Sequence, residues 1–556
     1  MFYPSKFLLC AACVSAPALV HAADGQTPGD RQDPSLAREQ LKDEAPRPAH
    51  GGAGPAIQSR PVSVPQLAEP ITPGAIRVDG ATVLPASAFA ETIQPYLGRT
   101  LSAQDLARLA GEVAAVLRRA GYGLATASVP AQKLENGVLR IQLDEGRIDE
   151  VDAGGDAAVE RVLRVLANGE PVKTARLERQ LLLAEDLAGA TLQKPEIVRR
   201  GGRQVLTVKV YRTKLSGRAG VDNWGSDSVG PVRATLSVDM NAVLADDDRL
   251  SIGGAVTPLK PGEFQYAEAT YAKALGSNGT EAAVSGYHAH TRTREQGGAR
   301  RVYDGNSSQA EIRVTHALAR SRAFSGWVTG DFALMDSALS LGGRPVRSDR
   351  VARASALLNL LARGKSHWIR GRIGIVQGLD LLGATEPGDP LASRRDASGR
   401  FTKVEFYSAF GADLAPRVGL LLALQGQFAS GPLLFSEEIG LGGQSFLRAF
   451  DYREVSGDEG AAASAELRYD FLRMPGPFRR GQLYLYADAG RVSNHENGFG
   501  GGTLASAGGG FRTWLRSGFE GSFEVGMPLT DSPFDPDPAP RVSFTLSKSF
   551  SAAGGK

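Results

Sequence analysis

The chain has 556 residues, of which 42% are hydrophobic and 22% are charged, and its mean hydropathy is −0.17. This balance excludes a membrane protein built from many helices, because after the N-terminus no run approaches the ~20 apolar residues of a spanning helix. The 63 Lys and Arg against 60 Asp and Glu give a net charge of +3 without basic clusters, which argues against a nucleic-acid partner. The 67 glycines follow no fixed period and suit a chain of many strands and turns.

Residues 1–22 have the pattern of a secretory signal peptide. The positive charge of Lys6 precedes an apolar run from Phe7 to Leu19, and Val20-His21-Ala22 offers a small-residue cleavage site. Both cysteines of the chain lie in this segment, so cleavage after it would leave no disulfide and no cysteine metal site. The pattern predicts export from the cytoplasm.

Residues 23–74 are rich in Pro, Gly, Asp and Gln and are expected to form a linker. Within it, residues 34–44 could form a short helix whose thin apolar face consists of Leu36 and Leu41. Two interpretations stay open. The whole segment could be a disordered linker, or the helix could dock elsewhere in the protein.

Residues 75–148 and 149–213 predict two successive α+β domains with the same order of elements. In the first, Ser102 and Asp105 form a capping-box pattern ahead of a helix with a 3.6-residue apolar period. A one-faced strand with alternating apolar residues follows it at 139–143. The second domain repeats the plan, with helices expected at about 157–166 and 175–188 and a strand at 205–211.

From residue 214 to residue 550 the chain consists of segments with strict alternation of apolar and polar residues. Such segments of about ten residues, separated by turns, predict a closed transmembrane β-barrel, here with about sixteen antiparallel strands. A soluble β-sandwich or β-helix is the alternative. Full charges on the polar faces, such as Arg233, Asp239 and Arg512, favour the barrel because a dry core would exclude them. Residues 551–556 are expected to form a tail.

One expected loop, at about 430–459, is far longer than the others. It contains Gly442 and Gly443, which permit a sharp fold-back, and then the segment Leu447-Arg448-Ala449-Phe450, which places a single cation among apolar side chains. Such an arginine could turn into the barrel lumen and pair with a carboxylate of the wall. The alternation predicts that Asp488, Glu466 and Arg468 face the lumen.

With these motifs, the chain resembles the TpsB outer-membrane transporters of two-partner secretion, within the Omp85 superfamily. Leu447-Arg448-Ala449-Phe450 is similar to the Val-Arg-Gly-Tyr/Phe tip of that family's inward loop, and Tyr486-Ala487-Asp488 is similar to its aromatic-x-Asp strand motif. Gly121-Tyr122 and Glu145-Gly146 resemble its first POTRA domain. The resemblance implies two POTRA domains before a sixteen-stranded barrel, and a pair between Arg448 and Asp488.

The resemblance also implies a function in protein export across the outer membrane of a Gram-negative bacterium. The POTRA domains would lie in the periplasm and recognise an unfolded, large secreted TpsA-type protein, an adhesin or a cytolysin, and the helix at 34–44 would plug the resting pore. Periplasmic chaperones and outer-membrane lipid are further expected partners. No catalytic residue, cofactor, metal or nucleic acid is expected.

Two functions of other classes remain as alternatives: an Omp85-type insertase that assists outer-membrane protein assembly, and a passive porin or outer-membrane enzyme. The sequence also departs twice from the family pattern. Ala449 replaces the usual glycine of the loop tip, which would narrow its backbone options, and six residues follow Phe550, the usual terminal residue.

Three weaker sequence patterns remain. His288-x-His290 places two imidazoles on one face of a strand, which could hold a metal, although a pair in the lumen or a loop is the simpler interpretation. Trp327, Trp368 and Tyr407 could anchor the barrel at the membrane interfaces. The run at Arg199, Arg200 and Arg203 is expected to be a solvated hairpin.

Overall fold

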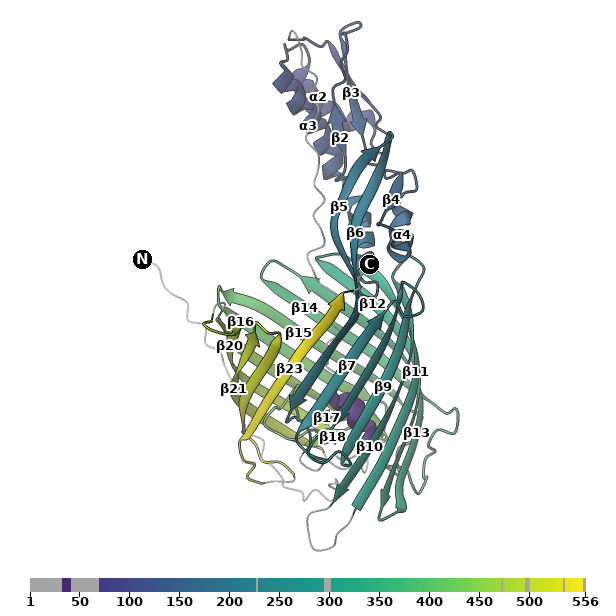
Figure 1. Cartoon of the computed structure of the whole chain (residues 1–556), viewed down its shortest axis with the longest axis vertical. Coiled ribbons are helices and arrows are strands. Elements are labelled where there is room, and N and C mark those ends of the chain that lie inside the picture. The colour runs from purple at the N-terminus through teal and green to yellow at the C-terminus, as the bar shows by residue number, and fades with distance from the viewer. Residues whose placement is uncertain are drawn as a thin grey trace, which may run out of the picture.

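The computed structural model describes residues 33–41, 70–226, 229–294, 302–471, 474–495, 501–533 and 536–553. The predicted signal peptide and most of the predicted linker lie outside the described residues. Two small α+β domains form an arm that stands on one end of a large barrel (Figure 1). We call this end of the barrel the near end and the opposite end the far end.

The first α+β domain is a three-stranded sheet covered by helices. Its elements are β1 (Ala75–Asp79), α2 (Ala90–Ile93), α3 (Ala103–Arg119), β2 (Thr126–Ser128) and β3 (Val138–Asp144), with the strand order β1-β3-β2. The helix α3 begins at Ser102 in a complete capping box with Asp105, as its sequence predicts. Its apolar stripe, which includes Leu106 and Val113, packs on the inner face of β3 to form the core.

The second α+β domain is joined to the barrel by one continuous strand. Its elements are β4 (Glu150–Asp152), α4 (Ala157–Leu163), α5 (Thr174–Glu185), β5 (Ala190–Arg200) and β6 (Arg203–Asp222). The first part of β6 pairs with β5 and β4, and its last part, from Thr213, pairs with the last strand of the barrel. The expected boundary at 213/214 therefore falls inside a single strand. The arginines of the β5–β6 hairpin are more than half exposed and form ion pairs with acidic residues of the two domains.

The barrel is a closed antiparallel sheet of sixteen strands, which confirms the predicted fold class. The strands after β6 are β7 (Arg233–Asn241), β8 (Asp248–Val256), β9 (Phe264–Leu275), β10 (Thr280–Arg294), β11 (Val302–Arg320), β12 (Phe324–Leu341), β13 (Arg344–Arg363), β14 (His367–Leu379), β15 (Thr402–Ala415), β16 (Val418–Ala429), β19 (Glu459–Phe471), β20 (Phe478–Ser493), β21 (Gly502–Leu515), β22 (Phe519–Pro528) and β23 (Arg541–Ala553). Closure comes from pairing of β23 with β6, which leaves no open sheet edge for lipid to meet.

The C-terminal end differs from the expected tail. Ser551, Ala552 and Ala553 continue β23 past Phe550 and pair with Ser216, Leu215 and Thr213 of β6. Residues 554–556 are outside the described residues. The backbone pairing that closes the barrel thus includes half of the residues after Phe550, because β6 offers unpaired backbone groups up to its junction with the arm.

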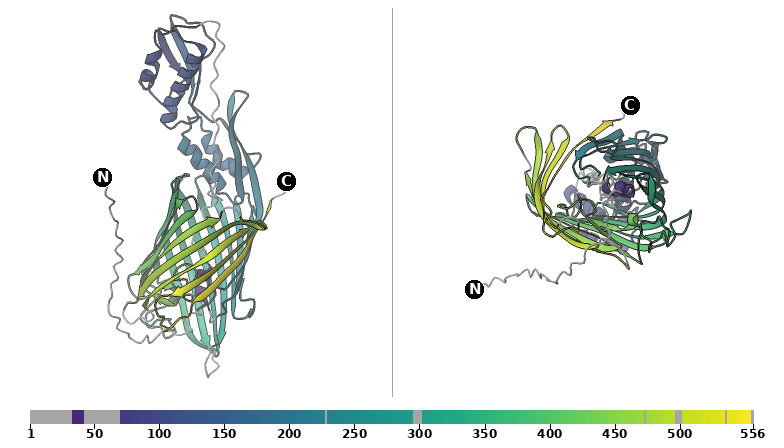
Figure 2. Two further views of the ribbon diagram at one scale, coloured as in Figure 1. Left: turned by 90° about the vertical axis from the view of Figure 1, so that its left-hand side faces the viewer. Right: turned by 90° about the horizontal axis from the view of Figure 1, so that it is seen from below.

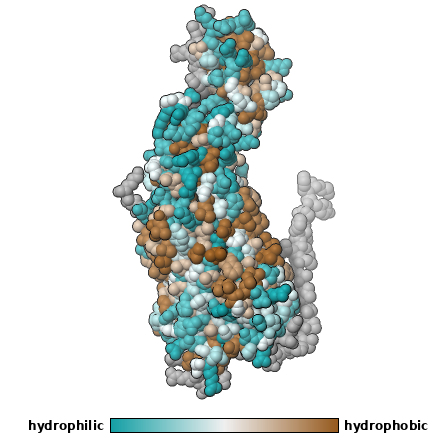
Figure 3. Space-filling view, turned by 90° about the vertical axis from the view of Figure 1, so that its right-hand side faces the viewer, coloured by the Kyte–Doolittle hydropathy of each residue, from teal (hydrophilic) through white to brown (hydrophobic). Residues whose placement is uncertain are grey.

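The outer face of the barrel is apolar and the inner face is charged. Apolar side chains point outward on strand after strand, for example Ile375, Leu424 and Leu485, which is 67% exposed. Figure 3 shows apolar surface over the barrel, while the arm and the far end are mostly hydrophilic. Among the described residues, no helix is both long and apolar enough to span a membrane.

The interpretation of His288 and His290 as a pair in the lumen or in a loop was wrong. His288 and His290 share the outward face of β10 with the exposed Val284, so they are neither in the lumen nor in a loop. Their Nδ1 atoms bond with Ser308 and Asn306 of β11.

The three aromatic residues also lie on the other face from the one that interface anchors require. Trp368 and Tyr407 face the lumen, where Arg370 contacts both rings, and Trp327 packs against the core of the second α+β domain. Their sequence context could not distinguish the two faces, because aromatic residues occur on both sides of these strands.

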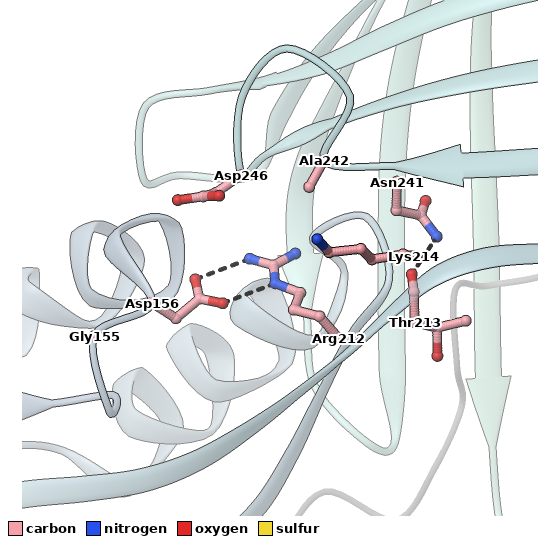
Figure 4. Close-up of a pocket in the computed structure, with 8 residues that line it drawn as sticks. All are labelled: Gly155, Asp156, Arg212, Thr213, Lys214, Asn241, Ala242 and Asp246. Atoms are coloured by element: carbon pink, nitrogen blue, oxygen red, sulfur yellow. Dashed lines mark hydrogen bonds and ion pairs between the residues drawn. The ribbon is translucent and has the colours of Figure 1, made fainter. Parts of the chain in front are cut away.

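The second α+β domain is fixed to the near end by ion pairs at two turns of the barrel, β7–β8 and β11–β12. Arg161 bonds with Asp247 at 2.7 Å, and Arg320 bonds with Asp186 at 2.7 Å. Beside the β7–β8 turn lies a cavity of ≈ 150 Å³, where Asp156 accepts two hydrogen bonds from Arg212 (Figure 4). Burial acts to raise the pKa of Asp156, but the bonds from Arg212 and from backbone amides hold it below its ordinary value.

Candidate functional site

The lumen contains two segments that do not belong to the wall. The first is the N-terminal helix, formed by a 3₁₀ turn η2 (Pro34–Leu36) and α1 (Ala37–Leu41). Figure 2 shows it inside the barrel when the molecule is viewed from the far end. The helix is thus docked rather than part of a free linker, and it ends at Leu41. The expected residues 42–44 lie outside the described residues.

The helix is held by ion pairs on one side and by the second segment on the other. Asp33 accepts a hydrogen bond from Ser337 at 2.8 Å and pairs with Arg347 at 3.3 Å, both on the wall. Arg38 pairs with Glu311 of β11 at 2.7 Å. A small apolar contact formed by Leu36, Phe435 and Tyr452 joins the helix to the long loop.

The second segment is the long loop 430–459, which begins at the far end and folds back into the lumen. It contains the 3₁₀ turn η6 (Phe435–Glu437) and a two-stranded ribbon of β17 (Ile439–Leu441) and β18 (Val455–Gly457). Gly442 makes the fold-back possible. Its φ is +116°, and an added Cβ would lie 2.1 Å from the carbonyl oxygen of Asp451. The position and length of this loop agree with the sequence-based expectation.

The neck of the loop is fastened by a fully buried carboxylate. Asp458 accepts hydrogen bonds from Arg394 at 2.7 Å, from the backbone of Leu433 at 2.8 Å and from the backbone of His495 at 2.8 Å. Arg394 belongs to the β14–β15 loop and also reaches Glu438 at 3.3 Å. Three segments of the far end are therefore joined at Asp458.

The middle of the loop is held by a second buried carboxylate. Glu437 pairs with Arg353 of β13 at 3.0 Å and with Lys403 of β15 at 2.9 Å. Arg453, 1% exposed, lies on the other side of the loop and pairs with Glu39 of the helix at 3.2 Å. A buried charge needs such partners, because an unpaired one would cost several kcal/mol.

The tip of the loop places Arg448 in a pocket of the wall. Its guanidinium donates to both oxygens of Asp488 at 3.1 Å, and its backbone N–H donates to Asp488 at 3.2 Å. The same guanidinium donates to Glu466 at 2.8 Å and lies 3.5 Å from the ring centre of Tyr486. The pocket offers two carboxylates and the face of an aromatic ring. A planar guanidinium can bind all three groups at once, and a lysine ammonium cannot.

A second arginine repeats this arrangement two residues away along the strands. Arg512 donates to both oxygens of Glu466, at 2.7 and 3.0 Å, and lies 3.6 Å from the ring centre of Tyr484. Tyr484 donates to Glu524 at 2.7 Å, and Arg468 donates to Glu466 at 2.6 Å. Three arginines thus face three carboxylates, so the formal charges of the cluster cancel.

Glycines on the neighbouring strands make room for the tyrosines and the tip. A Cβ at Gly508 would lie 2.6 Å from the Tyr486 hydroxyl, and one at Gly510 would lie 2.5 Å from the Tyr484 hydroxyl. A Cβ at Gly526 of β22 would lie 2.7 Å from the Tyr486 hydroxyl and 3.0 Å from Cα of Ala449. The tip therefore fits a wall that lacks side chains at these three places.

The expected restriction at Ala449 is absent. The tip residue with a left-handed backbone is Leu447, with φ = 59°, and Ala449 is not among the described residues with positive φ. Ala449 is buried against Gly526. Its methyl group thus occupies space that the wall provides, and it needs no unusual backbone conformation.

The structure brings together most of the candidate residues and adds several others. Leu447, Arg448, Ala449 and Phe450 form the tip, and Asp488, Tyr486, Glu466 and Arg468 surround it. The sequence patterns do not predict the roles of Glu524, Glu437 and Asp458. The lumen parity of β22 could have indicated Glu524, but no periodicity marks the residues inside a loop. Within the described ranges, no group of three or more His, Asp and Glu side chains has the arrangement of a metal site.

The architecture and the buried loop define a class: outer-membrane barrel transporters with a preceding POTRA-type arm. A family model described as haemolysin secretion/activation protein ShlB/FhaC/HecB matches residues 201–513, and a model of the ShlB-type POTRA domain matches residues 71–146. The chain belongs to this haemolysin secretion/activation family. It is an outer-membrane transporter of two-partner secretion with a TpsA-type secreted partner.

Relatives and solved structures agree with this assignment. The chain is 24% identical to the outer membrane transporter CdiB of Escherichia coli over 547 residues, which cover 94% of this chain and 89% of that protein. It is 28% identical to the heme/hemopexin transporter protein HuxB of Haemophilus influenzae (strain 86-028NP) over 173 residues, 30% of each chain.

The solved structures of CdiB show the same fold. CdiB from Escherichia coli has a TM-score of 0.72 at 22% identity and covers 94% of this chain and 99% of that one. CdiB from Acinetobacter baumannii has a TM-score of 0.61 at 18% identity and covers 93% and 96%. Family membership favours transport over the insertase, porin and enzyme alternatives.

Proposed function

We propose that this transporter accepts an unfolded secreted protein at its near end and releases it at its far end. The near end, with its arm, would face the periplasm, and the far end would face the outside of the cell. The observation that carries the proposal is the charged lumen, which holds two described segments that are not part of the wall.

The arm would provide the first contact for the secreted partner. Among the described strands, the three-stranded sheet of the first domain has unpaired edges at β1 and β2, which an extended segment of the partner could join as a further strand. In the second domain, β5 is a less suitable edge. Its pairing is interrupted between Gln193 and Glu196, where Lys194 has a positive φ and Pro195 lacks an N–H donor.

Within the barrel, the helix 33–41 would act as a plug and the loop 430–459 as a fixed inner structure. The pair of Arg448 with Asp488 would specify one position of the loop tip. A buried pair of this kind is a weak source of stability but a strong selector of one arrangement, because moving the tip would separate Arg448 from Asp488, for which it is the only ion-pair partner among the described residues.

Secretion of the partner tests this function directly. In a strain that carries a TpsA-type gene next to the gene of this protein, we expect deletion of this gene to remove the partner from the medium and the cell surface. Re-expression should restore it. Total outer-membrane proteins should stay at their normal level, and a general loss of those proteins would instead assign the insertase function. Unchanged secretion of the partner would contradict the proposal.

A further inference from the structure

One section of the lumen wall, the near half of β14, makes no hydrogen bond, ion pair or ring contact with the plug or the loop among the described residues. Phe446 of the loop packs edge-on against the neighbouring Tyr407 of β15. The plug contacts β10, β11 and β12, and the far half of β14 is covered through Val376, which packs with Leu433 and Leu434 of the loop. The near half of β14 begins at His367, next to the turn at 364–366. Within the described residues, no hydrogen bond, ion pair or ring contact joins Trp368, Arg370 or Arg372 to the plug.

These three residues face the lumen. Ile369 and Ile373, which alternate with them, are 46% and 51% exposed on the outer face, as lipid-facing residues of a barrel are. Trp368 lies over Gly411 of β15, where an added Cβ would meet the indole ring at 2.5 Å. The near half of β14 therefore presents one aromatic and two cationic side chains to the inside.

Arg370 is held by aromatic rings and not by a carboxylate. Its guanidinium carbon lies 5.7 Å from the ring centre of Trp368 and 5.3 Å from that of Tyr407, and it donates to the Tyr407 hydroxyl at 2.9 Å. Its Nε atom is buried and has no acceptor. The Nε of Arg372 is buried without an acceptor as well, and Arg372 forms no ion pair with any described residue.

Other lumen arginines differ from this pair. Arg448 and Arg512 share Glu466, and Arg353 is paired with Glu437. Glu405, the next lumen position on β15, is within electrostatic reach of Arg353. On β14, two positive charges thus stand on one face of the strand without an ion-pair partner among the described residues. Arginines on a lumen wall that have no carboxylate partner can pair with an anionic or carbonyl group of a ligand.

We infer that Arg370 and Arg372 form a contact site for the polypeptide in transit, with Trp368 and Tyr407 as its aromatic floor. An extended chain carries backbone carbonyl oxygens and, where acidic, carboxylates, and both accept hydrogen bonds from guanidinium groups. The aromatic rings keep Arg370 extended without neutralising it, which leaves its remaining donors for the ligand. The site favours acidic, extended segments and rests on the proposed export function.

Binding of a model peptide to the full chain in detergent tests the site. The probe is a fluorescein-labelled, unstructured Glu-Gly-Ser repeat peptide, and the readout is fluorescence anisotropy. We expect the double variant Arg370→Gln/Arg372→Gln to weaken binding about tenfold, because two charge-assisted contacts are removed. A Gln-Gly-Ser repeat peptide should bind more weakly and discriminate less between the proteins.

The matched control removes the same charge from exposed turns of the same end, as Arg417→Gln/Arg516→Gln, and should bind the acidic peptide like the unaltered protein. Heat-modifiable migration in gel electrophoresis checks that each barrel is folded. Equal binding by both double variants would overturn the site. Because this assay does not need secretion, its failure in a chain that still secretes its partner would leave the export function intact.

Discussion

The plug and the inward loop both fill the lumen, but the protein holds them by different means. At the loop tip, Arg448 and its two carboxylate partners Glu466 and Asp488 are each at most 7% exposed in their side chains. The plug is fixed by pairs with fewer members, and its Glu39 side chain is 48% exposed. Breaking the tip cluster would leave charged side chains buried without partners. Releasing the plug would instead return most of its charged side chains to water.

The length of the plug and the number of points that hold the loop support the same difference between them. The described plug has eight residues in helical conformation, which is too short for stability outside the protein, where about 12–15 residues are needed. The loop is fastened at its neck by Asp458, in its middle by Glu437 and at its tip by Arg448. We therefore expect the plug to be the exchangeable segment and the loop to be the fixed one.

The largest effect is expected from removal of the tip pair. Asp488→Ala leaves the buried Arg448 with one carboxylate fewer, at a cost of about 3–5 kcal/mol to that position of the tip. Export of the partner should fall at least tenfold while the barrel stays near its normal level in the membrane, and Arg448→Ala should do the same. Immunoblots of partner in the medium and of barrel in the membrane measure both.

A matched control is Arg218→Ala, which breaks a half-exposed lumen pair with Glu520 at 2.7 Å away from the loop. It should leave export close to normal, since exposed pairs contribute little. Normal export by both tip variants would show that the pair does not hold the loop in a working position.

A change of intermediate size is expected from the plug. Deleting residues 24–73 should raise the conductance of the pore in planar bilayers several-fold, because the segment that contacts β10, β11 and β12 inside the lumen is then lost. Replacing residues 33–41 alone with a Gly-Ser stretch of equal length should reproduce the increase. A conductance equal to that of the unaltered chain in both variants would mean that the helix does not block the pore.

A smaller effect should follow from filling the space beside the tip. In Gly526→Ala the new methyl group would lie 3.0 Å from Cα of Ala449, so the tip or Tyr486 must shift by a few tenths of an ångström. We expect export to fall about threefold, because overpacking of this kind costs ~1–3 kcal/mol. Gly521→Ala on the same strand meets nothing closer than 3.7 Å and serves as the control. Equal export by the two variants would show that the tip has room to adjust.

The sequence could predict features that depend on local periodicity. Strand alternation indicates the barrel and the inward direction of Asp488 and Glu466, and the capping box at Ser102 marks the start of α3. Glycine at 442 similarly indicates the fold-back, because few other residues accept its backbone conformation.

Other features depend on which segments meet in space, and alternation does not encode that. Glu437 and Asp458 lie in a loop without regular structure, and their partners come from strands and loops far away in the sequence. The faces of Trp368 and Tyr407 were assigned wrongly because aromatic side chains suit both a lipid interface and an arginine in the lumen.

The smallest effect concerns Ala449, the position where the family usually has glycine. If the tip needed a left-handed backbone there, Ala449→Gly would relieve strain and strengthen the tip. In this chain the left-handed residue is Leu447, so the substitution should instead remove a small buried methyl group and add backbone freedom, at a cost of about 1 kcal/mol or less. Secretion by Ala449→Gly should stay within twofold of normal. Leu447→Gly suits the local φ of 59° and should preserve the backbone, but it should lose the apolar contact with Phe446 and Phe450. A marked gain of export in Ala449→Gly alone would show that the backbone of the tip is strained at Ala449. It would also contradict the view that the loop is fixed and only the plug is exchangeable.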